Sequence, residues 1–269
     1  MSDTSIDVFI DLPSFPGPVQ AGRLWSHFRK GRESASFEYN KEWLANPHRF
    51  ALEPLLPLAD GTFHTNPGQS VFGAIGDSTP DRWGRILMRR AELARARTAN
   101  ESPHTLSELD YLLRVNDEAR QGALRFSQDG GQSFCAPPGS TPIPPLVNLS
   151  RLLHAADHFC RDDENAEDLR LLLAPGSSLG GARPKASVKD KKGNLCIAKF
   201  PRHDDEYDVV AWEAVALALA SKAGLQVPRF ELEKITDKDV LIVWRFDRTR
   251  EQRRISYLSA MSMLGARDN

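Results

Sequence analysis

The sequence predicts an α+β protein, in which a small mixed N-terminal domain precedes a second domain built from an antiparallel sheet and one main helix. Three observations predict this class. Short apolar segments with two-residue alternation recur in both halves, residues 206–224 have a helical composition, and residues 135–148 contain five prolines. We therefore expect domains at 1–134 and 149–269, joined by a Pro-rich linker at 135–148.

The composition is that of an ordinary globular protein, with 41% hydrophobic and 26% charged residues. A formal net charge of −1 gives no overall attraction for nucleic acid. The 3 cysteines are far apart and show no C-x-x-C spacing, which argues for a reducing compartment and against a disulfide framework. Neither a membrane-spanning apolar run nor a signal-peptide start is apparent, so we expect a cytoplasmic protein without a membrane contact.

The N-terminal domain is expected to begin as a sheet and to continue in helices. Strands are predicted at residues 8–10, 21–28, 34–39, 52–58 and 123–126, and a helical turn at 41–45. Pro80 in the first turn and Asp81 at the positive end predict a helix from about residue 80. A solvated surface is favoured for its polar face over a site for an acidic partner or phosphate, and this face carries Arg82, Arg85, Arg89 and Arg90. Thr105 and Glu108 predict a capping box for a helix ending at 113.

The second domain is expected to open with a helix at about residues 150–160, followed by an acidic loop at 162–168 that leads into residues 169–173. His154 and His158 have the i, i+4 spacing of zinc ligands, and Cys160 is close by. No H-E-x-x-H motif accompanies them, so a structural role is favoured and no metal site is predicted.

A Gly-rich loop from residue 176 leads into a predicted hairpin with strands at 185–189 and 195–200. Lys199 shares a strand face with Leu195 and Ile197. A lysine across a hairpin from a Gly-rich loop suits a phosphate-binding cleft, because main-chain N–H groups and an ammonium both attract phosphate oxygens. The loop does not match the Walker A motif, because Ala182 stands where the motif requires a lysine. Taken alone, the loop is also compatible with an ordinary connection that binds no ligand.

The helix predicted at 206–224 places Glu213 among apolar residues. A buried carboxylate needs a cationic partner, and Lys199 is the candidate; the alternative is that Glu213 is simply exposed. Strands are predicted at 230–235 and 240–248. The order of Gly-rich loop, lysine hairpin, glutamate helix and two strands is that of a protein-kinase small lobe.

These segments also resemble a known family. SSLGGARPKA, IAKFP, AGLQVP and RFDR, together with FGAIGDSTPDRWGR and DEARQGALRF upstream, resemble the HipA family of bacterial type II toxin–antitoxin serine/threonine kinases. The resemblance implies ATP and Mg²⁺ as cofactors, and a protein substrate that is an aminoacyl-tRNA synthetase in known members. It also implies a helix-turn-helix antitoxin of HipB type as partner, with DNA reached only through the antitoxin.

The resemblance assigns site residues by position. Ser178 matches a self-phosphorylated loop serine, Lys199 the ATP-contacting lysine, Glu213 its partner and Phe246 the hinge. The predicted nucleotide-binding set is Ser178, Gly180, Gly181, Ala182, Lys185, Lys199, Glu213 and Phe246. The catalytic aspartate and the metal ligands of the family are expected in a large lobe absent from this chain, so no catalytic or metal residue is assigned and turnover is not expected. The alternative is a non-catalytic fragment that docks an antitoxin or another partner.

Overall fold

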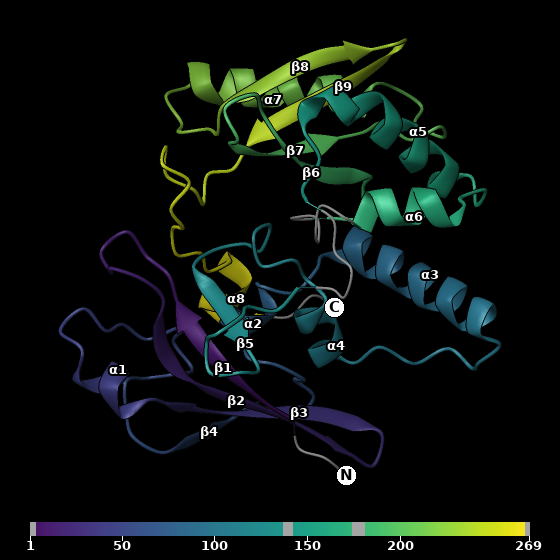
Figure 1. Ribbon diagram of the computed structural model, residues 1–269. Helices are drawn as coiled ribbons and strands as arrows, with labels where there is room; N and C mark the ends of the chain where they lie inside the picture. The colour runs from purple at the N-terminus through teal and green to yellow at the C-terminus, as the bar shows by residue number, and fades with distance from the viewer. Residues whose placement is uncertain (1–3, 137–141, 174–180, 267–269) are drawn as a thin grey trace. The chain divides into compact units, whose positions relative to one another are not determined.

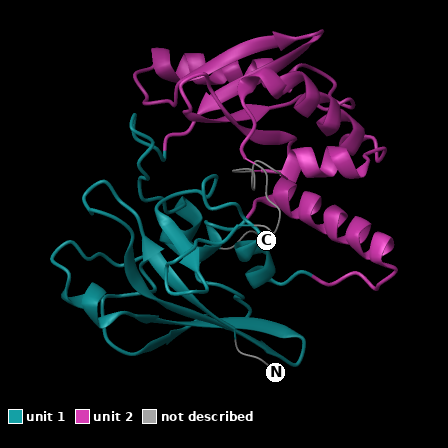
Figure 2. Ribbon diagram, in the orientation of Figure 1, with its two compact units in different colours: residues 1–79, 106–138, 247–269 teal, residues 80–105, 139–246 magenta. Residues whose placement is uncertain are grey.

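The computed structural model describes residues 4–136, 142–173 and 181–266. Two compact units are distinguished in Figure 2: unit 1 comprises residues 1–79, 106–138 and 247–269, and unit 2 comprises residues 80–105 and 139–246. Both units are discontinuous and therefore do not follow the contiguous ranges expected from the sequence. Residues 80–105 belong with unit 2 because their helix buries Trp83 and Leu87 in the core of that unit. The expected linker at 135–148 includes residues 137–141, which lie outside the described residues.

The α+β class is confirmed, because each unit combines an antiparallel sheet with helices. Unit 1 contains a five-stranded sheet in the order β4-β3-β2-β1-β5 (Figure 1). Its strands are β1 (Thr4–Ile10), β2 (Val19–Arg29), β3 (Arg32–Tyr39), β4 (Thr62–His64) and β5 (Leu124–Ser127). Lys30 and Gly31 both have positive φ, 51° and 74°, as a two-residue turn between twisted strands requires.

The helices of unit 1 are short, and the sheet packs with them around one apolar core. They are α1 (Lys41–Ala45), α2 (Gly73–Gly76), α4 (Glu108–Leu113) and α8 (Ala260–Leu264). The capping box of α4 is formed by Ser107 and Asp110, and not by Thr105 and Glu108 as the sequence predicted. The two boxes differ by two residues, and only the Ser107 side chain accepts the N–H group at the third helical position.

The strand predicted at residues 52–58 is absent, and this prediction was wrong. Pro54 and Pro57 lack the N–H groups that a strand ladder needs, so the segment folds as bends instead. The hydroxyl of Tyr39 accepts a hydrogen bond from the Leu52 amide at 3.0 Å and donates one to the Leu56 carbonyl at 2.7 Å. Leu52 and Leu56 are therefore buried from a loop, while Leu55 and Leu58 are exposed, and β4 takes the edge position of the sheet.

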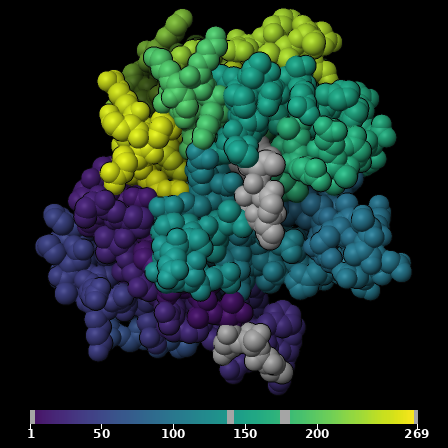
Figure 3. All heavy atoms as spheres, in the orientation of Figure 1, coloured from purple at the N-terminus to yellow at the C-terminus, as the bar shows by residue number. Residues whose placement is uncertain are grey.

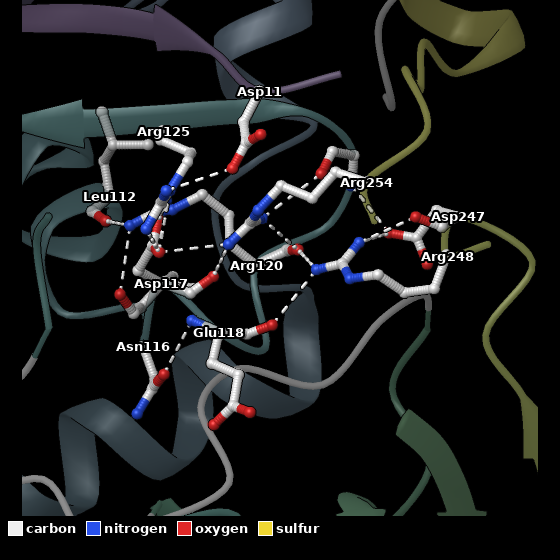
Figure 4. A network of polar contacts seen from close by, with 12 residues as sticks. Asp11, Leu112, Asn116, Asp117, Glu118, Arg120, Arg125, Asp247, Arg248 and Arg254 are labelled. Carbon is white, nitrogen blue, oxygen red and sulfur yellow. Dashed lines mark hydrogen bonds and ion pairs between the residues drawn. The ribbon is translucent and has the colours of Figure 1, made fainter. Parts of the chain in front are cut away.

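A network of arginines joins three parts of unit 1 that are distant in sequence (Figure 4). Arg120 is fully buried and donates to the carbonyls of Ser78, Leu112 and Val115 at 2.9, 2.9 and 3.1 Å. Arg248 donates to the Arg120 carbonyl at 2.7 Å. These bonds fix the chain that follows the second sheet against the loop before β5.

The same C-terminal segment also contacts the loop before β5 and the start of the chain. Arg254 forms an ion pair with Asp117 at 3.1 Å. Arg253 donates to the carbonyls of Leu12 and Phe15 at 3.0 and 3.2 Å. In the space-filling view the yellow C-terminal segment accordingly lies beside purple N-terminal residues (Figure 3). Unit 1 is thus completed by residues from both ends of the chain.

Unit 2 contains a four-stranded antiparallel sheet in the order β6-β7-β9-β8. Its strands are β6 (Lys185–Lys189), β7 (Leu195–Lys199), β8 (Phe230–Ile235) and β9 (Lys238–Trp244). The predicted hairpin and the two later strands are confirmed, although β9 ends four residues before the predicted limit. The Arg245 amide still pairs with the Leu195 carbonyl at 3.1 Å, and the chain turns at residues 246–247.

Helices cover both faces of this sheet (Figure 1). They are α3 (Arg82–Ala99), the 3₁₀ turn η1 (Leu146–Asn148), α5 (Leu149–Cys160), α6 (Ala166–Leu173) and α7 (Val209–Lys222). Val210 and Ala214 of α7 pack on Leu241 and Val243, on one face. The alternate residues of the strands face α3, α5 and α6, where Trp83 contacts the ring of Phe159 edge-on. The face that carries α7 also carries the candidate site.

Candidate functional site

A small pocket in unit 2 lies at the end of the β6–β7 hairpin, beside the start of α7. Lys185 and Lys199 are directly opposite each other in the antiparallel pair, so both side chains extend from the same face of the sheet. The pocket has a volume of about 160 Å³. It is lined by Gly181, Ala182, Arg183, Lys185, Lys199, Phe200, Val209, Val210 and Glu213.

Lys199 and Glu213 form an ion pair in this pocket, with the Lys199 Nζ donating to Glu213 Oε1. Asp208 starts α7 by accepting a hydrogen bond from the Ala211 amide at 2.8 Å, and this places Glu213 on the turn that faces β7. The two side chains are 27% and 38% exposed, so Glu213 is less buried than the sequence suggested. A pair this exposed adds only about 0–1 kcal/mol to stability. The ion pair instead fixes the position of the Lys199 ammonium, which remains exposed to the pocket.

Lys185 has a different environment from its neighbour. Its side chain is 2% exposed, and its Nζ donates to Asp81 Oδ2 at 2.8 Å and to the Gly181 carbonyl at 3.1 Å. Burial lowers the pKa of Lys185 below its usual value, and the carboxylate of Asp81 opposes that shift. The two lysines are therefore not equivalent, because one is enclosed by protein groups and the other faces the pocket.

Arg183 is a pocket residue that sequence reasoning missed. Its guanidinium pairs with Asp205, which also accepts a hydrogen bond from the Arg202 amide at 2.8 Å. The Arg183 side chain is 39% exposed, which leaves a second cation at the rim of the pocket. The R-x-K spacing before β6 was visible in the sequence, but nothing there indicated that Asp81 and Asp205 meet these cations.

The predicted loop residues are only partly within the described chain. Ser178 and Gly180 lie outside the described residues. Gly181 has a φ of 93°, a conformation that favours glycine, and Ala182 lines the pocket beside it. Phe246 lies in the turn after β9, is 60% exposed and is not among the residues that line this pocket. Its hinge role stays a prediction.

The pocket has room for a phosphate group, the part of a nucleotide that its cations can hold. A volume of about 160 Å³ is below the ~300–1,000 Å³ of typical ligand sites. Lys199 and Arg183 are donors without acceptor capacity, as recognition of a phosphate oxygen requires. Among the described lining residues Glu213 supplies the carboxylate, and it is paired with Lys199, so these residues do not form a set of oxygen ligands for Mg²⁺.

Metal-binding clusters and membrane-spanning helices are both absent from residues 4–136, 142–173 and 181–266. In these ranges no group of three or more His, Cys, Asp or Glu side chains is arranged to hold a metal ion. His154 stacks on His158 with ring centroids 3.9 Å apart, and His158 Nδ1 lies 3.0 Å from Asp168 Oδ2. This contact links α5 to α6, in agreement with the structural role favoured from the sequence. In the same ranges, every helix is too short or too polar to cross a bilayer.

Comparisons with known proteins agree with the sequence motifs. A model of the HipA N-terminal domain matches residues 17–127, and a model of the HipA-like C-terminal domain matches residues 177–269. A search of curated protein sequences found no significant match.

A solved structure is similar over nearly the whole chain. It is the toxin–antitoxin system complex of HipA, HipB and operator DNA from Shewanella oneidensis MR-1, which matches with a TM-score of 0.52 and 19% identity. The match covers 97% of this chain and 56% of that chain, so the present chain spans little more than half of its length. At this identity the likeness shows a shared fold. With both domain models matching in order along the sequence, the chain belongs to the HipA family.

Proposed function

We propose that these 269 residues form the nucleotide-binding part of a HipA-type toxin that is a serine/threonine protein kinase using ATP and Mg²⁺. The observation that carries this proposal is the Lys199–Glu213 ion pair, which lies in a pocket bordered by Gly181. A strand lysine oriented by a helix glutamate is the arrangement that protein kinases use to hold ATP phosphates.

In this proposal the side chains of unit 2 recognise and orient the phosphates. Glu213 holds the Lys199 ammonium at the mouth of the pocket, so less side-chain entropy is lost when a phosphate oxygen binds. Arg183 adds a second donor at the rim. Mg²⁺ neutralises phosphate charge when it is bound. Because the lining residues do not form a ligand set for this ion, the proposal for the pocket is limited to contacts made by its cations.

The partner proposed for this chain is a helix-turn-helix antitoxin of HipB type. The matched Shewanella structure contains HipB and operator DNA, so DNA contact is proposed only through the antitoxin. The resemblance further implies an aminoacyl-tRNA synthetase as protein substrate. The cytoplasm is the proposed location, because the separated cysteines argue for a reducing compartment. The same complex favours a second candidate function, in which the chain docks an antitoxin without chemistry.

Titration of ATP and of adenosine into the 269-residue protein tests the first function. Loss of one charge-assisted hydrogen bond costs about 1.5–3 kcal/mol, so Lys199→Ala is expected to weaken ATP binding by about ten-fold or more. Adenosine affinity is expected to stay the same, since it carries no phosphate. Lys192→Ala, on the exposed turn of the same hairpin, is the matched control.

Equal ATP affinity in wild type and Lys199→Ala would refute nucleotide binding by this pocket. Antitoxin binding separates the second function: if docking is the role of the chain, a purified HipB-type antitoxin binds wild type and Lys199→Ala equally, and neither protein binds ATP.

A further inference from the structure

The start of α3 and the start of β6 share one carboxylate. Asp81 Oδ1 accepts a hydrogen bond from the Gly84 amide at 2.9 Å and so caps α3. Asp81 Oδ2 accepts the bond from Lys185 Nζ at 2.8 Å. One side chain therefore performs two separable tasks, because its cap needs only an oxygen acceptor while its second bond pairs a buried cation with a negative charge.

The carbonyl of Gly181 is held by the same two elements. It accepts hydrogen bonds from Lys185 Nζ at 3.1 Å and from the Trp83 amide at 3.3 Å. Trp83 also donates its ring Nε1–H to the Lys185 carbonyl at 2.9 Å. Trp83 is buried against Phe159, so it is itself fixed by the core of unit 2. Gly181, at the edge of the pocket, is thus attached to a rigid support made by the first turn of α3.

The charges of the pocket depend on this attachment. Lys185 and Lys199 are directly opposite in the β6–β7 pair, and like charges in that position repel. Each has its own carboxylate, Asp81 for Lys185 and Glu213 for Lys199. With its side chain 2% exposed and two of its three donor positions used, the Lys185 ammonium is committed to the protein. Lys199 is left as the lysine that faces a ligand.

We propose that Asp81 is a positioning residue of the pocket, which acts through Lys185 to fix the Gly181 carbonyl, and that Lys185 supports the loop and does not bind phosphate. The effect on ligand affinity rests on the proposed nucleotide-binding function. The attachment of Gly181 does not, and it is tested separately.

The substitution Asp81→Asn separates the two tasks of this residue. Asparagine caps a helix about as well as aspartate, so α3 keeps its cap while Lys185 loses its counter-charge. Asp81→Ala removes both. Asp190→Asn is the matched control: Asp190 is also hydrogen-bonded, to the Asn194 amide at 2.8 Å, but it lies at the other end of β6.

Hydrogen exchange of the Trp83 amide in the nucleotide-free protein tests the attachment. Because this amide donates to Gly181, Asp81→Asn is expected to speed its exchange by about ten-fold, the effect of losing roughly 1.4 kcal/mol of protection. Asp190→Asn is expected to leave it unchanged. An unchanged rate in Asp81→Asn overturns the proposal, whatever the protein binds.

The affinity for ATP tests the role of Lys185 by the sign of the change. Removing a negative charge near a phosphate site raises ATP affinity if Lys185 is a phosphate ligand that Asp81 restrains. A positioning role predicts the opposite, a fall of about ten-fold in both Asp81→Asn and Asp81→Ala with adenosine affinity unchanged. A change in melting temperature alone, with ATP affinity preserved or raised, overturns the proposal.

The outcomes distinguish this inference from the proposed function. If Lys199→Ala weakens ATP binding and Asp81→Asn does not, the pocket binds nucleotide but Asp81 does not position it. If Lys199→Ala has no effect while the Trp83 amide exchanges faster in Asp81→Asn, the proposed function fails and the attachment of Gly181 stands.

Discussion

Replacing Arg120 by methionine is expected to destabilise unit 1 strongly. The guanidinium is fully buried and donates to three main-chain carbonyls, and it lies 4.7 Å from the ring centroid of Phe126. Burial lowers the pKa of Arg120 to about 10, so the group is still charged at pH 7. Methionine has a similar volume, so the loss arises from the carbonyls left without this donor.

The size of the effect follows from these bonds. Each buried carbonyl left unsatisfied costs about 1–3 kcal/mol. The Leu112 carbonyl keeps the Val115 amide as a donor at 3.5 Å, and relaxation of the loop recovers a further part of the loss. We expect a total of about 3–5 kcal/mol, which is in the range for breaking a buried charged network. At about 2–4 °C per kcal/mol, the melting temperature of unit 1 should fall by roughly 6–20 °C.

Because the chain has two compact units, urea unfolding should be followed by hydrogen exchange, which reports each unit separately. Amides of β1 and β5 are expected to lose protection, while those of β6 and β7 keep it. Arg29→Met, at the exposed end of β2, is the control and should change stability by less than about 0.5 kcal/mol. A stability of Arg120→Met within 1 kcal/mol of wild type would refute the structural role assigned to the network.

Three further predictions concern particular side chains. Burial raises the pKa of Tyr39 from 10.0 to about 12. The folded state therefore holds this proton more tightly, so the free energy of unfolding should fall as the pH rises from about 10 to 12. Tyr39→Phe should lower the free energy of unfolding by about 1–3 kcal/mol at pH 7. In urea titrations the variant should also lose less stability at alkaline pH than the wild type does. Burial also raises the pKa of the Cys196 thiol to about 12, so this thiol should react with a disulfide reagent only on unfolding. Because Cys135 and Cys160 are only partly buried, the modified thiol must be located by peptide mapping, and rapid modification of Cys196 itself in the native protein would contradict this prediction. A Cβ at Gly22 would lie 2.2 Å from the Glu38 carbonyl oxygen, so Gly22→Ala should cost more than about 2 kcal/mol in thermal unfolding, whereas Gly17→Ala, with open space around it, should cost little.

Strands that are specified by alternation and turn residues within a short segment were predicted correctly from the sequence. The hairpin at β6 and β7 and the strand β8 follow from two-residue alternation and turn residues, and their limits agree with the structure to within one residue. The segment at 52–58 looked like a strand because of its leucines. Its prolines were the stronger signal, since they deny the segment a hydrogen-bond ladder.

The candidate site was predictable to the extent that its contacts are short in sequence. Lys199 and Glu213 are separated by one loop, and their pairing was predicted from the expected burial of Glu213, although its side chain is 38% exposed. Asp81 is 104 residues away from Lys185, and the sequence assigned it only to a helix cap. Its second bond exists because α3 packs in the core of unit 2, a tertiary contact that no local pattern specifies.

The most direct test of the account is an NMR titration of the lysine side chains of the wild-type protein, with the resonances of Lys199 and Lys185 assigned from arginine substitutions. The central claim is that the Lys199 ammonium contacts the phosphates while Lys185 remains bound to Asp81. Addition of ATP is predicted to shift the Lys199 resonance and to leave the Lys185 resonance nearly unchanged, and adenosine is predicted to shift neither resonance. A shift of the Lys185 resonance alone, or no shift of either resonance at saturating ATP, would contradict the central claim.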